Sequence, residues 1–187
     1  MARGAYLLTG GRHAPEPYAL ERFSCAAGPA GWRYVATRED PRTGAPLGRL
    51  DVVLDARGVA VRVQVEAGGW SLRGGVVGDE ALWRRGEQER RERAVGFTGT
   101  SPVWLLASAR LVGEEPVRLR LVRLGDEALA TRVVEEGWVR TGTQDRDGLV
   151  VARLEAADLA TAERRVVHVA GDLVLEAPGT ALVEVEA

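Results

Sequence analysis

The sequence predicts an all-β protein: one curled antiparallel sheet of the half-barrel or barrel type, with one or two short helices. Three observations predict it. Short segments of alternating polar and apolar residues recur roughly every 8–12 residues. Glycine and proline turns separate them. No strand–helix–strand alternation is present, as a parallel sheet would require. Because β folds of this length commonly share one core, we expect a single domain over residues 1–187.

The composition of the chain limits which kinds of partner and which cellular location can be expected for the protein. The net charge of -2 and the pI of about 5.8 argue against a nucleic-acid partner, since such proteins usually present a basic face. One cysteine, Cys25, excludes an internal disulfide. No segment reaches the roughly 18–20 apolar residues of a membrane span, and the first apolar stretch is too short for a signal peptide. We therefore expect a soluble cytoplasmic protein.

The strands are predicted in chain order from alternation and turn residues. The clearest hairpin joins residues 49–55 to 59–67 through a turn at 56–58, and Val59, Val61, Val63 and Val65 are expected to share one buried face. Further strands are expected at residues 4–10, 17–26, 31–39, 70–76, 79–85, 87–97, 116–124, 132–141, 149–155, 166–170, 172–177 and 181–186. Residues 156–163 are predicted to form one short helical turn.

Residues 94–113 form the one long segment with almost no charge, with a single arginine in twenty residues. Apolar residues at Val103, Leu106, Ala107 and Leu111 approximate helical spacing, which favours a short helix or a buried loop over another strand. An apolar segment inside a β meander is expected to lie across a curved sheet and to close its concave face.

The sequence offers little for catalysis. Its two histidines, His13 and His168, have no HxxxH, HxH or CxxC neighbours, so we expect no metal site and no cofactor. Cys25 lacks a local activating group, and the serines at 101 and 108 are outside any GxSxG motif. The sequence therefore favours a binding protein over an enzyme and predicts no catalytic residue. A hydrolase using His168 is the second alternative.

The arginine-rich and tryptophan-rich segments each have two interpretations. Residues 84–93 hold five arginines and three glutamates. This pattern is typical of a solvated strand that resists aggregation, but arginines on one face also suit an anionic group. The five tryptophans either fill the core or line a cavity for an apolar ligand.

The segment from residue 83 to 111 resembles a family of glycolipid-binding proteins. LWRRG, ERAVGFTGTSP and LLASARL occur in the family's order, and the matching positions are Trp83, Gly86, Phe97, Thr98, Thr100, Arg110 and Leu111. The hairpin before them is similar too, so the resemblance covers mainly residues 49–112. It implies the fold of periplasmic lipoprotein carriers, which is a curled antiparallel sheet with a short helix in its concavity.

We accordingly expect a non-enzymatic protein that binds an amphipathic lipid or glycolipid in the concave face of its sheet. The expected ligand-binding residues are Trp70, Trp83, Phe97, Trp104, Leu106 and Arg110. The first alternative is a protein-interaction module that uses an exposed sheet edge. The sequence leaves the oligomeric state open, a dimer included.

Overall fold

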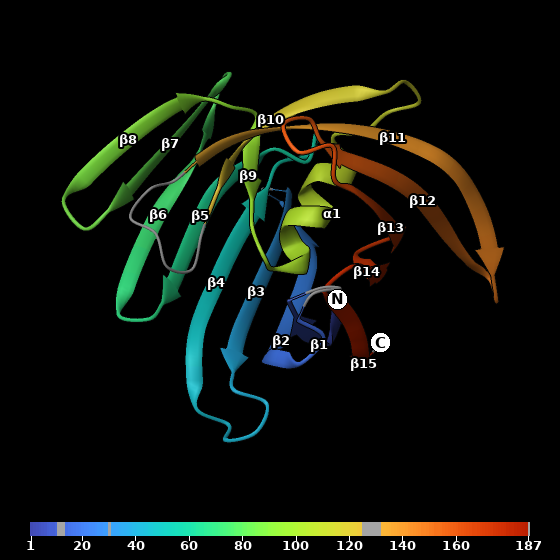
Figure 1. The fold of residues 1–187 in the computed structure, drawn as a ribbon, viewed down its shortest axis with the longest axis horizontal. Coiled ribbons are helices and arrows are strands. Elements are labelled where there is room, and N and C mark those ends of the chain that lie inside the picture. The colour runs from blue at the N-terminus through green and yellow to red at the C-terminus, as the bar shows by residue number, and fades with distance from the viewer. Residues whose placement is uncertain (11–13, 30, 125–131, 187) are drawn as a thin grey trace.

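A computed structural model describes residues 1–10, 14–29, 31–124 and 132–186. One sheet of 15 strands curls around a single described helix (Figure 1). The strands are β1 (Ala2–Thr9), β2 (Pro17–Gly28), β3 (Gly31–Glu39), β4 (Pro46–Leu54), β5 (Ala60–Ala67), β6 (Trp70–Val77), β7 (Glu80–Arg85), β8 (Gln88–Arg93), β9 (Gly96–Thr98), β10 (Val117–Arg123), β11 (Arg132–Arg146), β12 (Leu149–Asp158), β13 (Arg164–Ala170), β14 (Leu173–Ala177) and β15 (Thr180–Glu186). The helix is α1 (Pro102–Arg110).

The strand order confirms the curled all-β fold. Strands β1 to β8 form one meander, β10 to β15 form a second with β9 added at its edge, and β1 and β15 pair in the middle of the sheet. All pairings among the described strands are antiparallel except that of β9 with β10, which is parallel. The chain passes through α1 between these two strands, so the expected absence of a strand–helix–strand unit is wrong at this one place. Among the described strands, β8 and β9 are the edges of the sheet.

The structure confirms two of the four predicted valines as buried, places Val59 before β5 as a partly buried residue, and corrects the fourth. Val63 and Val65 are buried as expected, but Val61 is 44% exposed. The register shifts there, because Val53 lies opposite Arg62 and Leu54 opposite Ala60, which leaves Val61 in a bulge. The neighbouring strand accommodates the bulge with Gly75, where a Cβ atom would lie 2.4 Å from the Val61 carbonyl oxygen.

Helix α1 forms where the uncharged segment predicted it. The Ser101 hydroxyl caps the first turn by accepting a hydrogen bond from the Val103 N–H, and Pro102 occupies the first turn, where it costs no hydrogen bond. Figure 1 shows α1 lying inside the curl of the sheet, and its buried apolar side chains belong to the hydrophobic core. The helical turn predicted at residues 156–163 is wrong. Strand β12 continues to Asp158, whose carboxylate accepts hydrogen bonds from the Ala160 and Thr161 N–H groups and so stabilises a turn.

A buried carboxylate fastens the N-terminal end of α1 to the sheet. Glu21 of β2 is fully buried. Its oxygens accept hydrogen bonds from the Tyr34 hydroxyl (2.7 Å), the Arg38 guanidinium (2.8 Å) and the Ser101 hydroxyl (2.6 Å). Burial and the neighbouring Glu21 charge raise the pKa of Tyr34 well above its usual value, so Tyr34 acts as a donor. We refer to these four residues as the Glu21 cluster.

No helix in the described part of the chain is long and apolar enough to cross a membrane.

Candidate functional site

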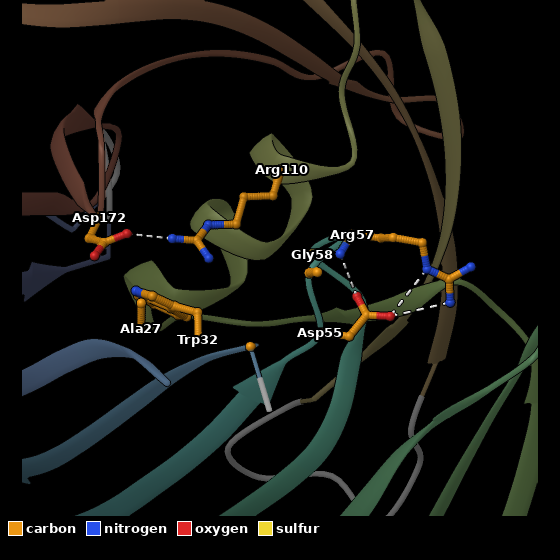
Figure 2. A pocket seen from close by; sticks show the side chains of 9 residues that line it. Ala27, Trp32, Asp55, Arg57, Gly58, Arg110 and Asp172 are labelled. Atoms are coloured by element: carbon orange, nitrogen blue, oxygen red, sulfur yellow. Dashed lines mark hydrogen bonds and ion pairs between the residues drawn. The ribbon is translucent and has the colours of Figure 1, made fainter. Parts of the chain in front are cut away.

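A cleft of about 480 Å³ opens at the C-terminal end of α1, on the rim of the curled sheet (Figure 2). Its walls come from the β2 and β3 ends, the turn between β4 and β5, the helix end and the turn between β13 and β14. The lining residues are Ala27, Gly31, Trp32, Asp55, Ala56, Arg57, Gly58, Arg110 and Asp172. We call this the rim cleft.

Three side chains form a layered unit in the rim cleft. The Arg110 guanidinium carbon lies 4.2 Å from the centroid of the Trp32 ring, which is cation–π geometry. Its Nη2 donates a hydrogen bond of 2.5 Å to Asp172 Oδ1. Figure 2 shows Arg110 reaching from the helix across the indole toward Asp172. Burial lowers the pKa of Arg110 and Asp172 opposes this shift, so the guanidinium is partly desolvated and held in place by two partners.

The opposite wall is a turn built on Asp55. Asp55 Oδ1 accepts hydrogen bonds from the Arg57 and Val59 backbone N–H groups, each at 2.9 Å, and Oδ2 pairs with the Arg57 side chain at 3.2 Å. Desolvation raises the pKa of Asp55, but these hydrogen bonds outweigh it, and the net shift is downward. Gly58 follows with φ +87°, and a Cβ there would lie 2.6 Å from that of Arg110. Only glycine allows the turn to approach the helix this closely.

The rim cleft has equal numbers of positively and negatively charged side chains, which also supply hydrogen-bond donors and acceptors. Arg57 and Arg110 balance Asp55 and Asp172, so the lining carries no net charge. Trp32 adds a buried indole N–H that has no hydrogen-bond partner among the described residues. A neutral ligand with several hydroxyl groups suits such a lining, because each hydroxyl both donates and accepts.

The structure separates the six residues predicted to bind ligand. Trp83, Phe97, Trp104 and Leu106 are buried in the hydrophobic core, where the Phe97 and Trp104 ring centroids lie 6.2 Å apart. Only Arg110 reaches the rim cleft.

The sixth predicted residue, Trp70, lines a second cleft of about 440 Å³ beside the turn between β5 and β6. There the Arg85 guanidinium carbon lies 4.4 Å from the centroid of a Trp70 ring. The pair repeats the Arg–Trp contact of the rim cleft. Glu66 and Ser71 supply polar groups to this second cleft.

Trp32, Asp55 and Asp172 belong to the rim cleft and were not predicted as site residues. Trp32 is among the tryptophans expected either to fill a core or to line a cavity, and it does both. The two aspartates lie in turns that look like any other turn in the sequence. No local pattern could have joined residues of β3, α1 and the turn before β14.

His168 and Cys25, the two residues weighed for catalysis, have different neighbours. His168 Nδ1 lies 3.2 Å from Glu176 Oε2, and the Cys25 thiol lies 3.9 Å from the Asp172 carbonyl oxygen. Burial raises the pKa of Cys25 to about 11, which leaves a thiol rather than a nucleophilic thiolate at neutral pH. His13 lies outside the described residues. Within the described residues, no group of three or more His, Cys, Asp or Glu side chains is placed to hold a metal ion.

Comparison with known proteins supports the fold. No family model matches the chain, and no curated protein matches it. A solved structure of a DUF1089 family protein from Pseudomonas aeruginosa is similar, with a TM-score of 0.57 and 18% identity over 85% of this chain and 89% of that one. At this identity the likeness shows a shared β fold alone. The description of that protein names no ligand, so the lipid or glycolipid stays a prediction.

Proposed function

We propose that this protein binds an amphipathic small molecule, a lipid or glycolipid, with the polar head group in the rim cleft. The observation that carries the proposal is the layered unit in which Arg110 lies on Trp32 and pairs with Asp172. It places an aromatic surface, a cation and an anion around one opening of about 480 Å³. This volume is within the range of small-molecule sites, roughly 300–1,000 Å³.

The balanced charge of the rim cleft favours a sugar head group over a phosphate. A phosphate would bring about two negative charges next to two carboxylates, Asp55 and Asp172, that are already paired. A sugar adds no charge, and its hydroxyls can bond to a guanidinium and a carboxylate together.

In this proposal the apolar part of the ligand lies where the rim cleft meets the hydrophobic core. Trp32 lines the rim cleft and also belongs to the hydrophobic core. Beside it, the C-terminal turn of α1 rests on the sheet through Arg110 and the close approach of Gly58. An alkyl chain therefore lies along Trp32 and under this turn, where the cleft meets the core.

Titration with octyl glucoside below its micelle concentration tests the proposal, with binding followed by calorimetry. Arg110→Gln should weaken binding about tenfold, because it removes a charge-assisted hydrogen bond and the cation over Trp32. Arg85→Gln is the matched control, since it disturbs the equivalent Arg–Trp contact at the second cleft and should leave binding unchanged.

Octyl phosphate and octanol serve as comparison ligands. We expect octyl glucoside to bind more tightly than either. Tighter binding of octyl phosphate would indicate that the rim cleft prefers an anionic head group to a sugar. The proposal fails if none of the three ligands binds, or if Arg110→Gln and Arg85→Gln weaken binding equally. Native mass spectrometry of the purified protein gives an independent check, because a co-purifying lipid should appear as added mass that Arg110→Gln reduces.

A further inference from the structure

Strand β8 is an exposed edge of the sheet. Among the described strands it pairs with β7 alone, and all six of its residues are exposed. The other edge strand, β9, is buried at all three of its residues. Figure 1 shows the β7–β8 hairpin at one side of the sheet, beside β6 and away from the helix. An edge of this kind leaves a row of backbone N–H and C=O groups open to a further strand.

The charges along β8 alternate between its two faces. Arg90 and Glu92 lie opposite Trp83 and Ala81, so they share the concave face of the sheet. Glu89 and Arg93 lie on the convex face, as does Arg91 between them. The concave face therefore carries Arg90 and Glu92 two positions apart, and the convex face carries Glu89 and Arg93 four positions apart with Arg91 midway between them.

Two copies of β8 become complementary when they pair antiparallel about a two-fold axis at Arg91. Such an axis, perpendicular to the sheet, keeps the faces of both copies on the same side. It places Arg90 of each copy directly opposite Glu92 of the other. The concave face therefore gains two ion pairs across the interface.

On the convex face this axis places Glu89 of each copy opposite Arg93 of the other. The two faces together then have four pairs of opposite charge and one pair of like charge, Arg91 with Arg91. An axis moved to Glu92 would instead put that glutamate opposite itself and Arg91 opposite Arg93. Directly opposed charges stabilise a strand pair when they differ and destabilise it when they match. The sequence of β8 therefore distinguishes between these registers.

We propose that β8 is a self-association edge, where a second copy of this chain pairs antiparallel in the register centred on Arg91 and extends the sheet across the dimer. Two contacts within the chain are compatible with this pairing. Arg93 lies 2.9 Å from Asp79 and Glu92 lies 3.9 Å from Arg120, and all four side chains are partly or largely exposed. Arg93 and Glu92 can therefore each keep a partner in their own chain and gain another across the interface.

Sedimentation velocity over a concentration series tests the proposal with the full chain. Wild type should show a monomer–dimer equilibrium that weakens as salt rises, because exposed ion pairs are screened. Arg90→Glu alone sets two carboxylates against each other at both concave pairs, and Glu92→Arg alone sets two guanidinium groups against each other there. Each variant should weaken the dimer by about tenfold or more. Arg73→Glu on β6 is the matched control for a charge reversal away from the edge.

Mixing the two single variants gives the decisive result. An Arg90→Glu chain and a Glu92→Arg chain are complementary at both pairs, so their mixture should form a heterodimer although each variant dimerises poorly alone. The double variant R90E/E92R restores both pairs within one chain and should dimerise again. Circular dichroism confirms that each variant is folded, and the equivalent exchange at Glu89 and Arg93 replaces any variant that is not.

Three results would overturn the proposal. Wild type could remain monomeric at the highest soluble concentration. Both single variants could dimerise as well as wild type, which would place the interface elsewhere. The mixture of single variants could fail to recover the dimer, which would mean that these charges do not face one another.

Discussion

Removing the carboxylate of the Glu21 cluster should destabilise the fold far more than removing a surface carboxylate. Glu21 is fully buried and accepts three hydrogen bonds, from Tyr34, Arg38 and Ser101. Glu21→Ala leaves the Arg38 guanidinium, itself largely buried, without this partner. Breaking one side of a buried ion pair costs about 3–5 kcal/mol.

That free energy corresponds to a large thermal shift. For a chain of 150–250 residues, 1 kcal/mol lowers Tm by about 2–4 °C, so Glu21→Ala should lower Tm by about 6–20 °C. The matched control is Glu39→Ala on β3, which removes a partly exposed carboxylate paired with Arg22. It should cost no more than about 1 kcal/mol. Urea unfolding followed by tryptophan fluorescence measures both.

A double-mutant cycle then tests whether the cluster joins helix to sheet. Ser101→Ala removes the N-cap and should cost about 1–2 kcal/mol. Because Ser101 and Glu21 share a hydrogen bond, their combined loss should be smaller than the sum of the two. The reasoning is refuted if Glu21→Ala costs less than about 1 kcal/mol, or if the two losses simply add.

Burial predicts three further outcomes. Val63→Asp should lower the free energy of unfolding by several kcal/mol because Val63 is fully buried. Val61→Asp, in the bulge, should change it by less than about 0.5 kcal/mol. Equal losses would mean that the bulge is absent. Leu106→Ala should cost about 2–5 kcal/mol in thermal unfolding, since Leu106 is 1% exposed, and a smaller loss would indicate that it borders a cavity. Cys25, with a pKa of about 11, should be unreactive toward iodoacetamide at pH 8 until the protein unfolds. In the folded protein only about one thiol in 1,000 is a thiolate at this pH. Rapid labelling of the folded protein would contradict the burial of Cys25.

The fold could be predicted largely because its causes are local. Alternating residues define the strands, and the uncharged segment before Arg110 defines α1, which Ser101 and Pro102 begin. Val61 shows where local evidence ends. Its bulge depends on Gly75 in the neighbouring strand, and a pattern read along one strand does not contain that partner.

The candidate site could be predicted only in part, because sequence cannot tell whether a large ring fills a core or lines a cavity. Aromatic character makes Trp83 and Trp104 candidates for ligand binding, but the core uses that same property. Arg110 is the one predicted residue that reaches the rim cleft. Its partners, Trp32 and Asp172, lie far from it in the chain and meet it only because the sheet curls.

The central pairing of β1 with β15 has a consequence for how the chain folds. Each meander is made of neighbours in sequence, so β1 to β8 can assemble as soon as they leave the ribosome. The join between the two meanders needs the last strand of the chain, and Tyr6 reaches across it to accept a hydrogen bond from the Val174 N–H. Contacts between residues this far apart close large loops, which slows folding. During synthesis, the edge of β1 that later pairs with β15 stays unpaired until β15 has been made. Apolar surface at this edge is exposed during that interval, and this is the stage at which chaperones would act.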